Sequence, residues 1–146
     1  MFDKILIANR GDSACRVAAT CQRLGIAAAA VHSSADRAAL HVRLIGESVE
    51  IGGPAASQSY LDGAAIIAAA RTVAAEAIHP GIGFLSEDAA FARAVEAAGL
   101  VFIGPTPETL ERFADKRAAK AEAREAGIPT LDGGAEGSAE AAEVAA

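Results

Sequence analysis

Residues 77–87 read Ala-Ile-His-Pro-Gly-Ile-Gly-Phe-Leu-Ser-Glu, an apolar strand that stops at a glycine-bracketed loop and restarts as a helix. Pro80 cannot donate a ladder hydrogen bond and biases His79 towards extended backbone, so the strand is predicted to end there. Gly81 and Gly83 permit turns that other residues disfavour, and they leave room for a ligand or a second domain to approach. In an open parallel sheet such a loop lies at the carboxyl end of a strand, where ligands bind. The alternative is a tight strand-to-helix connection made of ordinary turn residues.

Apolar runs alternate with helical patterns on both sides of this stretch. Short runs rich in Ile, Val and Ala predict strands, and apolar residues three and four apart predict the helices between them. This alternation predicts the α/β class, here a Rossmann-like open parallel sheet of five strands with helices on both faces. The predicted strands are 4–9, 27–32, 48–51, 77–79 and 100–103, and the predicted helices lie within 14–24, 34–43, 60–73, 87–98, from 107 onward, and 115–126.

Two of these helices have a predicted core face that the structure can test. The pattern of apolar residues gives each face, although alanine contributes most of it in the first case. The residues expected to face inward are Leu61, Ala64, Ala65, Ile67 and Ala68 in the first helix, and Phe91, Ala94 and Val95 in the second.

The composition suits one domain followed by a short tail. The chain has 146 residues, enough to bury a core, and we expect a domain over 1–130 and a tail, or the start of a further part, over 131–146. A net charge of −6 and a pI near 5.0 argue against a nucleic-acid or membrane-surface partner, which would need a basic patch. Neither a charged and apolar leader nor a run of about 18 strongly apolar residues is visible, so the cytoplasm is the expected location.

The two cysteines are expected to be structural. Cys15 and Cys21 fall within one predicted helix and point about 240° apart around its axis, so they are not expected to form a disulfide. No second cluster of Cys or His at metal-ligand spacing accompanies them, which favours small buried apolar groups over a metal site.

The first turn tests one alternative class, a dinucleotide-binding domain. That class places G-x-G-x-x-G between the first strand and helix, whereas residues 9–14 here read Asn-Arg-Gly-Asp-Ser-Ala. A single glycine provides fewer backbone contacts for a pyrophosphate, and Asp12 adds a like charge beside it. Asp36 follows the second strand, where an acidic residue can bind a ribose hydroxyl, but without the glycines it is weak support. The sequence therefore predicts a Rossmann-like fold without the dinucleotide.

Three motifs resemble the amino-terminal domain of biotin carboxylase in order and spacing. They are Met1-Phe-Asp-Lys-Ile-Leu-Ile-Ala-Asn-Arg-Gly11, His79-Pro-Gly-Ile-Gly-Phe-Leu-Ser-Glu87, and Phe102-Ile-Gly-Pro105 followed by Asp115-Lys116. The resemblance runs from Met1 to about Pro129, and it is specific because it does not depend on one short glycine pattern. Three further segments resemble the biotin-bearing subunits of acyl-CoA carboxylases, of the 3-methylcrotonyl, propionyl or acetyl type. They are Arg16-Val-Ala-Ala-Thr20, Glu50-Ile-Gly-Gly53 and Ser59-Tyr-Leu61.

The resemblance implies cofactors, partners and site residues. Biotin carboxylases are ATP-grasp ligases that use ATP, Mg and bicarbonate to carboxylate biotin, and they work with a biotin carboxyl carrier and a carboxyltransferase. The resemblance implies an ATP-phosphate contact at Lys116, and less strongly at Lys120, and a homodimer contact at Arg16. Unaided by the resemblance, these three are cations on solvated helix faces. The biotin-pocket loop that the resemblance implies consists of His79, Gly81, Ile82, Gly83 and Phe84; no residue is assigned a catalytic or metal-binding role.

Three residues depart from the family pattern. Ile82 stands where the family usually has tyrosine, which removes a hydrogen bond and a flat apolar contact from the biotin wall. Asp12 replaces the usual glutamate, and Asp88 stands where asparagine is common. In the family, the phosphate-covering loop, the magnesium carboxylates, the bicarbonate pocket and the catalytic arginine all follow this domain. We therefore expect one wall of an active site that is not catalytic alone; the alternative is a stand-alone, non-catalytic relative that binds a carboxylase subunit or a nucleotide.

Overall fold

The core of the protein is a parallel sheet of five strands. In a computed structural model that describes residues 1–131, the strands are β1 (Lys4–Ile7), β2 (Ala27–His32), β3 (Ser48–Glu50), β4 (Ala77–His79) and β5 (Val101–Phe102). Their order in the sheet is β3-β2-β1-β4-β5, and every neighbouring pair is parallel. The predicted fold class is therefore confirmed, with strands one to two residues shorter than predicted at several ends.

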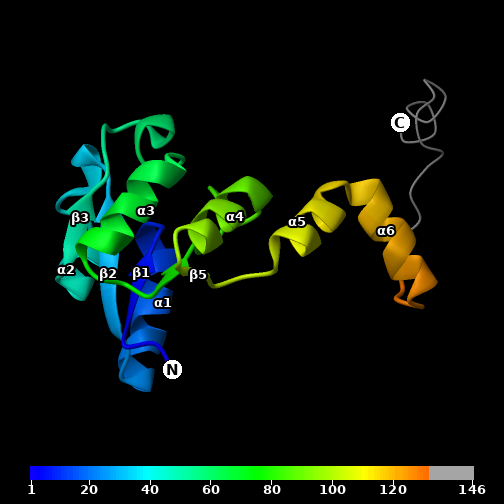
Figure 1. Cartoon of the computed structure of the whole chain (residues 1–146), viewed down its shortest axis with the longest axis horizontal. Coiled ribbons are helices and arrows are strands. Elements are labelled where there is room, and N and C mark those ends of the chain that lie inside the picture. The colour runs from blue at the N-terminus through cyan, green and yellow to red at the C-terminus, as the bar shows by residue number, and fades with distance from the viewer. Residues whose placement is uncertain (132–146) are drawn as a thin grey trace. The chain divides into compact units, whose positions relative to one another are not determined.

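Helices cover both faces of this sheet, because successive strand side chains point to opposite sides. Ile5 and Ile7 pack with α1 (Gly11–Leu24) and α2 (Leu40–Ile45) in one apolar cluster. Leu6 and Ala8 pack in another, with α3 (Gly63–Thr72) and α4 (Ala89–Ala97). Figure 1 shows these four helices around the strands. Two short 3₁₀ turns, Ser34–Asp36 and Ala56–Gln58, complete the connections of this part of the chain.

The strand order reverses direction between β1 and β4. From β1 the chain moves outward through β2 to β3, then returns to lay β4 on the other side of β1 and β5 beyond it. The connections that leave the carboxyl ends of β1 and β4 therefore diverge to opposite faces of the sheet, which opens a crevice there. Crevices of this kind are where doubly wound α/β proteins bind ligands.

The predicted core face of α3 is wrong. The helix begins at Gly63, with Asp62 as its N-cap, and its buried residues are Ile66, Ala69 and Ala70. Leu61 precedes the helix and is 45% exposed. Ala64 and Ala68 are also exposed, and Ala65 and Ile67 only partly buried. A run of alanines gives little difference in hydrophobicity between the faces of a helix. The predicted inner face was therefore placed on the wrong side of the helix axis when its start was set at residue 60 and not at Gly63.

The predicted face of α4 is largely right, and α1 is buried along one side. Ala14 and Cys21 are buried in α1, and Gly25 ends it in a left-handed conformation with φ 70°. Both cysteines are free, and burial raises the pKa of the Cys21 thiol. In α4, Phe91 and Val95 are buried as predicted, but Ala92 replaces Ala94 on the inner face.

The chain divides into two compact units, of which the first is Met1–Glu111 and the second starts at Arg112. Helix α5 (Pro107–Ala114) spans this boundary, and α6 (Lys116–Glu125) belongs to the second unit. Residues 132–146, which form nearly all of the predicted tail, lie outside the described residues. Among residues 1–131, no helix is long and apolar enough to cross a membrane.

Candidate functional site

A pocket of about 530 Å³ lies at the carboxyl ends of β1 and β4. Five of the residues singled out from the sequence line it: His79, Gly81, Ile82 and Phe84 from the loop after β4, and Arg16 from α1. Gly83 belongs to the same loop but is not part of the lining. The remaining lining comes from the first turn and the start of α1, and consists of Asn9, Arg10, Asp12, Ser13 and Val17.

The buried amide of Asn9 fixes the backbone of the loop after β4. Its Nδ2 donates hydrogen bonds to the carbonyl oxygens of Pro80, at 2.7 Å, and of Ile82, at 3.0 Å. Gly81 lies directly against this amide with φ 71°, and a Cβ at that position would come within 2.5 Å of Asn9 Nδ2. The close approach of the two loops therefore requires glycine at position 81.

The imidazole of His79 is held by the same loop. Its Nδ1 accepts a hydrogen bond of 3.0 Å from the Gly81 N–H, so a neutral ring carries its proton on Nε2. Burial lowers the pKa of His79, which favours this neutral form. His79 can therefore donate a hydrogen bond from Nε2 as an uncharged group at the pocket wall. Among residues 1–131, no acid or nucleophile is hydrogen bonded to it.

Phe84 closes the loop in an unusual conformation. Its φ is 47°, in the left-handed region that a bulky side chain rarely adopts. Its ring stacks on the buried ring of Tyr60, with centroids 5.2 Å apart and planes 14° from parallel. The Arg10 guanidinium carbon lies 5.2 Å from the Tyr60 centroid and 5.6 Å from the Phe84 centroid, within the range of a cation–π contact.

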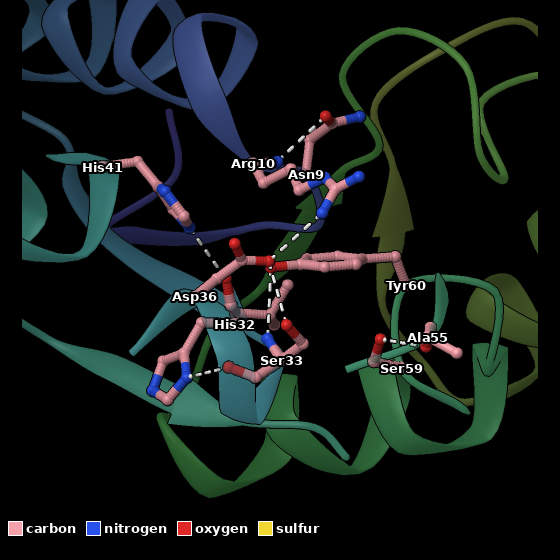
Figure 2. A network of polar contacts seen from close by, with 10 residues as sticks. Asn9, Arg10, His32, Ser33, Asp36, His41, Ala55, Ser59 and Tyr60 are labelled. Carbon is pink, nitrogen blue, oxygen red and sulfur yellow. Dashed lines mark hydrogen bonds and ion pairs between the residues drawn. The ribbon is translucent and has the colours of Figure 1, made fainter. Parts of the chain in front are cut away.

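A polar cluster around Asp36 fixes this stack, and Figure 2 shows it from close by. Asp36 Oδ2 accepts hydrogen bonds from the Tyr60 hydroxyl at 2.7 Å and the Ser33 hydroxyl at 2.9 Å, and it pairs with Arg10 Nη1 at 3.3 Å. The Tyr60 oxygen in turn accepts from the Ser33 N–H at 3.1 Å. The cluster thus joins the ends of β1 and β2 to the connection that precedes α3.

The ionisation of this cluster follows from its contacts. Partial burial opposes the charge on Asp36, but hydrogen bonds from Tyr60, Ser33 and Arg10 outweigh it, so the pKa of this carboxyl is lowered. Burial, together with the hydrogen bond to Asp36, raises the pKa of Tyr60 to about 12. Asp36 is therefore ionised, and its Oδ2 is used by hydrogen bonds within the protein. These hydrogen bonds give Asp36 a structural role in place of the ribose contact considered from the sequence.

Two of the three departures from the family pattern, Ile82 and Asp12, face outward, and so does Arg16. The Ile82 side chain is 82% exposed, although its carbonyl is held by Asn9. Asp12 and Arg16 are exposed on the first half of α1. Arg16 lines the 530 Å³ pocket and also a second, apolar pocket of about 380 Å³ between α1 and the sheet.

Lys116 lies in the second unit as the first residue of α6, and it is exposed. The Asp115 carboxylate caps this helix by accepting from the N–H groups of Arg117 and Ala118, which lower the pKa of Asp115. The N–H groups of Arg117 and Ala118 are therefore occupied, and the exposed ammonium of Lys116 is the charged group that this helix start offers an anion. Lys120 lies one turn further along the same helix and is partly buried.

Sequence reasoning missed three groups of this site: the Asn9 amide, the Arg10 guanidinium and the Tyr60 ring. A polar residue directly after a buried strand was a usable signal for Asn9, because a buried amide needs partners. Nothing local marked Tyr60, which meets Asp36 across 24 positions of sequence and Phe84 across another 24.

An open parallel sheet with a ligand-sized pocket at its switch point defines a doubly wound α/β binding domain. Within that class, the first turn and the loop after β4 carry the distinguishing residues. The chain belongs to the biotin carboxylase N-terminal domain family, whose sequence profile matches residues 1–110. The resemblance found from the three motifs is therefore confirmed.

The relatives are parts of biotin-dependent carboxylases. The chain is 54% identical over 132 residues to a biotin carboxylase of Nostoc sp. (strain PCC 7120 / SAG 25.82 / UTEX 2576), covering 90% of this chain and 30% of that protein. It is 52% identical over 131 residues to the mitochondrial methylcrotonoyl-CoA carboxylase subunit alpha of Oryza sativa subsp. japonica, covering 90% of this chain and 18% of that one. The chain is thus similar to a part that is shared by a protein named biotin carboxylase and by a subunit of an acyl-CoA carboxylase.

A solved structure agrees with this. The biotin carboxylase domain of a single-chain bacterial carboxylase superposes with a TM-score of 0.84 at 45% identity, covering 97% of this chain and 33% of that one. The chain therefore spans about a third or less of the relatives it matches.

Proposed function

We propose that this chain is the N-terminal domain of a biotin carboxylase and forms one wall of the site where biotin is carboxylated with ATP and bicarbonate. The observation that carries the proposal is the pocket at the β1–β4 switch point, lined by the loop of residues 79–84. It occurs in a chain that is 54% identical to a biotin carboxylase but spans 30% of it. A wall of this length needs another polypeptide segment to complete the site.

The lining of the pocket suits the head group of biotin. That group is a neutral urea fused to an apolar ring, and pockets for such ligands combine apolar walls with a few polar groups. Phe84, Ile82 and Val17 supply apolar surface, and the neutral His79 supplies a hydrogen-bonding group. Bound there, biotin would supply the nitrogen that takes up the carboxyl group, while these residues orient its ring and exclude water.

ATP and magnesium differ in how well this chain suits them. Lys116 presents an exposed ammonium at the start of α6, which can offset phosphate charge without a fixed geometry. Among residues 1–131, no group of three His, Cys, Asp or Glu is placed to hold a metal ion. The magnesium site is therefore assigned to the segments that complete the enzyme.

Partners and location follow from the same proposal. The proposed partners are a biotin carboxyl carrier, a carboxyltransferase and a second copy of the chain that contacts Arg16, and the proposed location is the cytoplasm. Exposure of Arg16 beside an apolar pocket supports the homodimer. Sedimentation of Arg16→Glu against Arg23→Glu, on the same helix, tests it: only the first is expected to weaken dimers.

The activity is tested with a chimera in which residues 1–131 replace the matching part of the Nostoc biotin carboxylase. We expect the chimera to release ADP in a bicarbonate- and biotin-dependent reaction. We expect the isolated chain to release ADP no faster than its Lys116→Ala variant. In the chimera, Lys116→Ala is expected to raise the KM for ATP and Arg117→Ala to leave it unchanged.

Two results would overturn the proposal. A folded but inactive chimera would favour the stand-alone, non-catalytic relative that binds a carboxylase subunit or a nucleotide. Bicarbonate-dependent ATP hydrolysis by the isolated chain would show that no further segment is needed.

A further inference from the structure

The loop of residues 80–84 is fastened at two separate points. At its start, the Asn9 amide holds the carbonyls of Pro80 and Ile82. At its end, the Phe84 ring lies on the Tyr60 ring. Between these points, Gly83 also has a positive φ, of 69°, and a Cβ there would meet nothing within 4 Å. The second half of the loop therefore depends on the Phe84 contact for its position.

That contact has to offset a backbone cost. A bulky residue with φ near 47° is strained by about 1 kcal/mol, and such strain persists only where surrounding contacts enforce it. The Tyr60 ring is fully buried and cannot shift without breaking its hydroxyl contacts to Asp36 and to the Ser33 N–H. Arg10 closes the arrangement from the pocket side, because it pairs with Asp36 and lies over both rings.

We infer that Tyr60, held through its hydroxyl by Asp36, is a positioning residue for the biotin-facing loop. It lines no part of the pocket and acts through Phe84, which does. The inference rests on the proposed function for its ligand, biotin. Its physical content, that the phenolic oxygen of Tyr60 immobilises residues 83–84, can be tested in the isolated chain.

The first test compares Tyr60→Phe with Ser59→Ala. Tyr60→Phe keeps the ring and removes the hydrogen bond to Asp36. Ser59→Ala removes the hydrogen bond of a neighbouring, equally buried side chain, whose hydroxyl donates to the Ala55 carbonyl at 2.8 Å. The reporter is the amide of Ser86, which donates to the Gly83 carbonyl in the second half of the loop. The amide of Gly81, which donates to His79 Nδ1 in the half that Asn9 holds, is the internal reference.

In the 146-residue chain, we expect Tyr60→Phe to speed hydrogen exchange of the Ser86 amide at least about fivefold relative to the Gly81 amide, and Ser59→Ala to leave it unchanged. Equal exchange rates in the two variants would overturn the inference. If Tyr60→Phe does not fold, Phe84→Leu removes the stack while leaving Tyr60 and Asp36 intact. Phe84→Leu is likewise expected to exchange faster than Ser59→Ala, and equal exchange rates would again overturn the inference.

The second test measures steady-state kinetics in the active chimera. Tyr60→Phe is expected to raise the KM for biotin at least about fivefold with the KM for ATP unchanged, because only the biotin wall is loosened. An unchanged KM for biotin would overturn the positioning role. An inactive wild-type chimera would instead count against the proposed function. The positioning role would still be tested by hydrogen exchange, because that experiment needs no active chimera.

Discussion

At the scale of single residues, the pocket depends on a few buried groups that bridge loops distant in sequence. Asn9 is 3% exposed and links the first turn to residues 80–82, so one amide sets the spacing of both pocket walls. His79 and Phe84 are each constrained by a contact that is easy to remove by substitution. Each of the three yields a prediction.

Asn9→Ala is expected to lower the free energy of unfolding by about 2 kcal/mol, because the buried carbonyl of Pro80 and the partly buried carbonyl of Ile82 lose their donor. Thr72→Ala is the control, since the Thr72 hydroxyl donates one exposed hydrogen bond within α3. It is expected to change the same quantity by less than about 0.5 kcal/mol. Urea unfolding measures both, and equal effects would contradict the role given to Asn9.

His79 makes stability depend on pH in a defined window. Because burial lowers its pKa below the ordinary value of 6.5, the folded protein binds fewer protons than the unfolded chain between the two values. The contribution is fully present above about pH 6.5 and is lost as pH falls towards the folded pKa. His79→Asn keeps an acceptor for the Gly81 N–H but does not titrate, so its unfolding free energy should fall less between about pH 7 and pH 5. Parallel curves for the two proteins would refute this.

Phe84 reports on backbone strain through a pair of substitutions. Phe84→Ala and Phe84→Gly both remove the stack on Tyr60, but only glycine relieves a φ of 47°. We expect the glycine variant to be more stable than the alanine variant by about 1 kcal/mol. At exposed Ala68 in α3, glycine should instead be less stable than alanine by about the same amount. The same order at both sites would show that Phe84 is unstrained.

At the scale of elements, the strands were predictable and the alanine-rich helix was not. Runs such as Ile5-Leu6-Ile7 must be buried on both faces, which fixes a parallel strand from composition alone. In α3 the neighbours are mostly alanine, so the inner face is decided by Ile66 and by the cap at Asp62. Asp62 and Asp88 are both N-caps, and neither helix start was placed correctly from the apolar pattern.

The cap of α4 explains why Asp88 can stand where asparagine is common. Its side-chain oxygen accepts from the Phe91 N–H at 2.9 Å, a contact that asparagine makes equally well. Asp88→Asn is therefore expected to leave stability unchanged, whereas Asp88→Ala should cost about 1 kcal/mol. Thermal unfolding of the two variants checks this. A large loss of stability in Asp88→Asn would show that the negative charge of Asp88, and not only its hydrogen bond, stabilises the helix start.

At the scale of the whole molecule, four of the loop residues singled out by motif line one pocket: His79, Gly81, Ile82 and Phe84. The first turn and α1 complete it because β1 and β4 are neighbours, and its role as a biotin pocket stays a prediction. The Asn9 anchor and the Tyr60 stack were not foreseen, since each joins segments that only the folded sheet brings together. Lys116 belongs to the second unit, and its contact with ATP stays a prediction.

The central claim is that the loop after β4 forms the biotin wall, and a matched pair of glycine substitutions tests it most directly. Gly81 and Gly99 have φ of 71° and 78°, so alanine strains both backbones alike, but only at Gly81 does the new Cβ collide with Asn9. In the active chimera, Gly81→Ala is expected to raise the KM for biotin at least about tenfold, and Gly99→Ala to leave it unchanged. Equal KM values for biotin in the two folded variants would contradict the account.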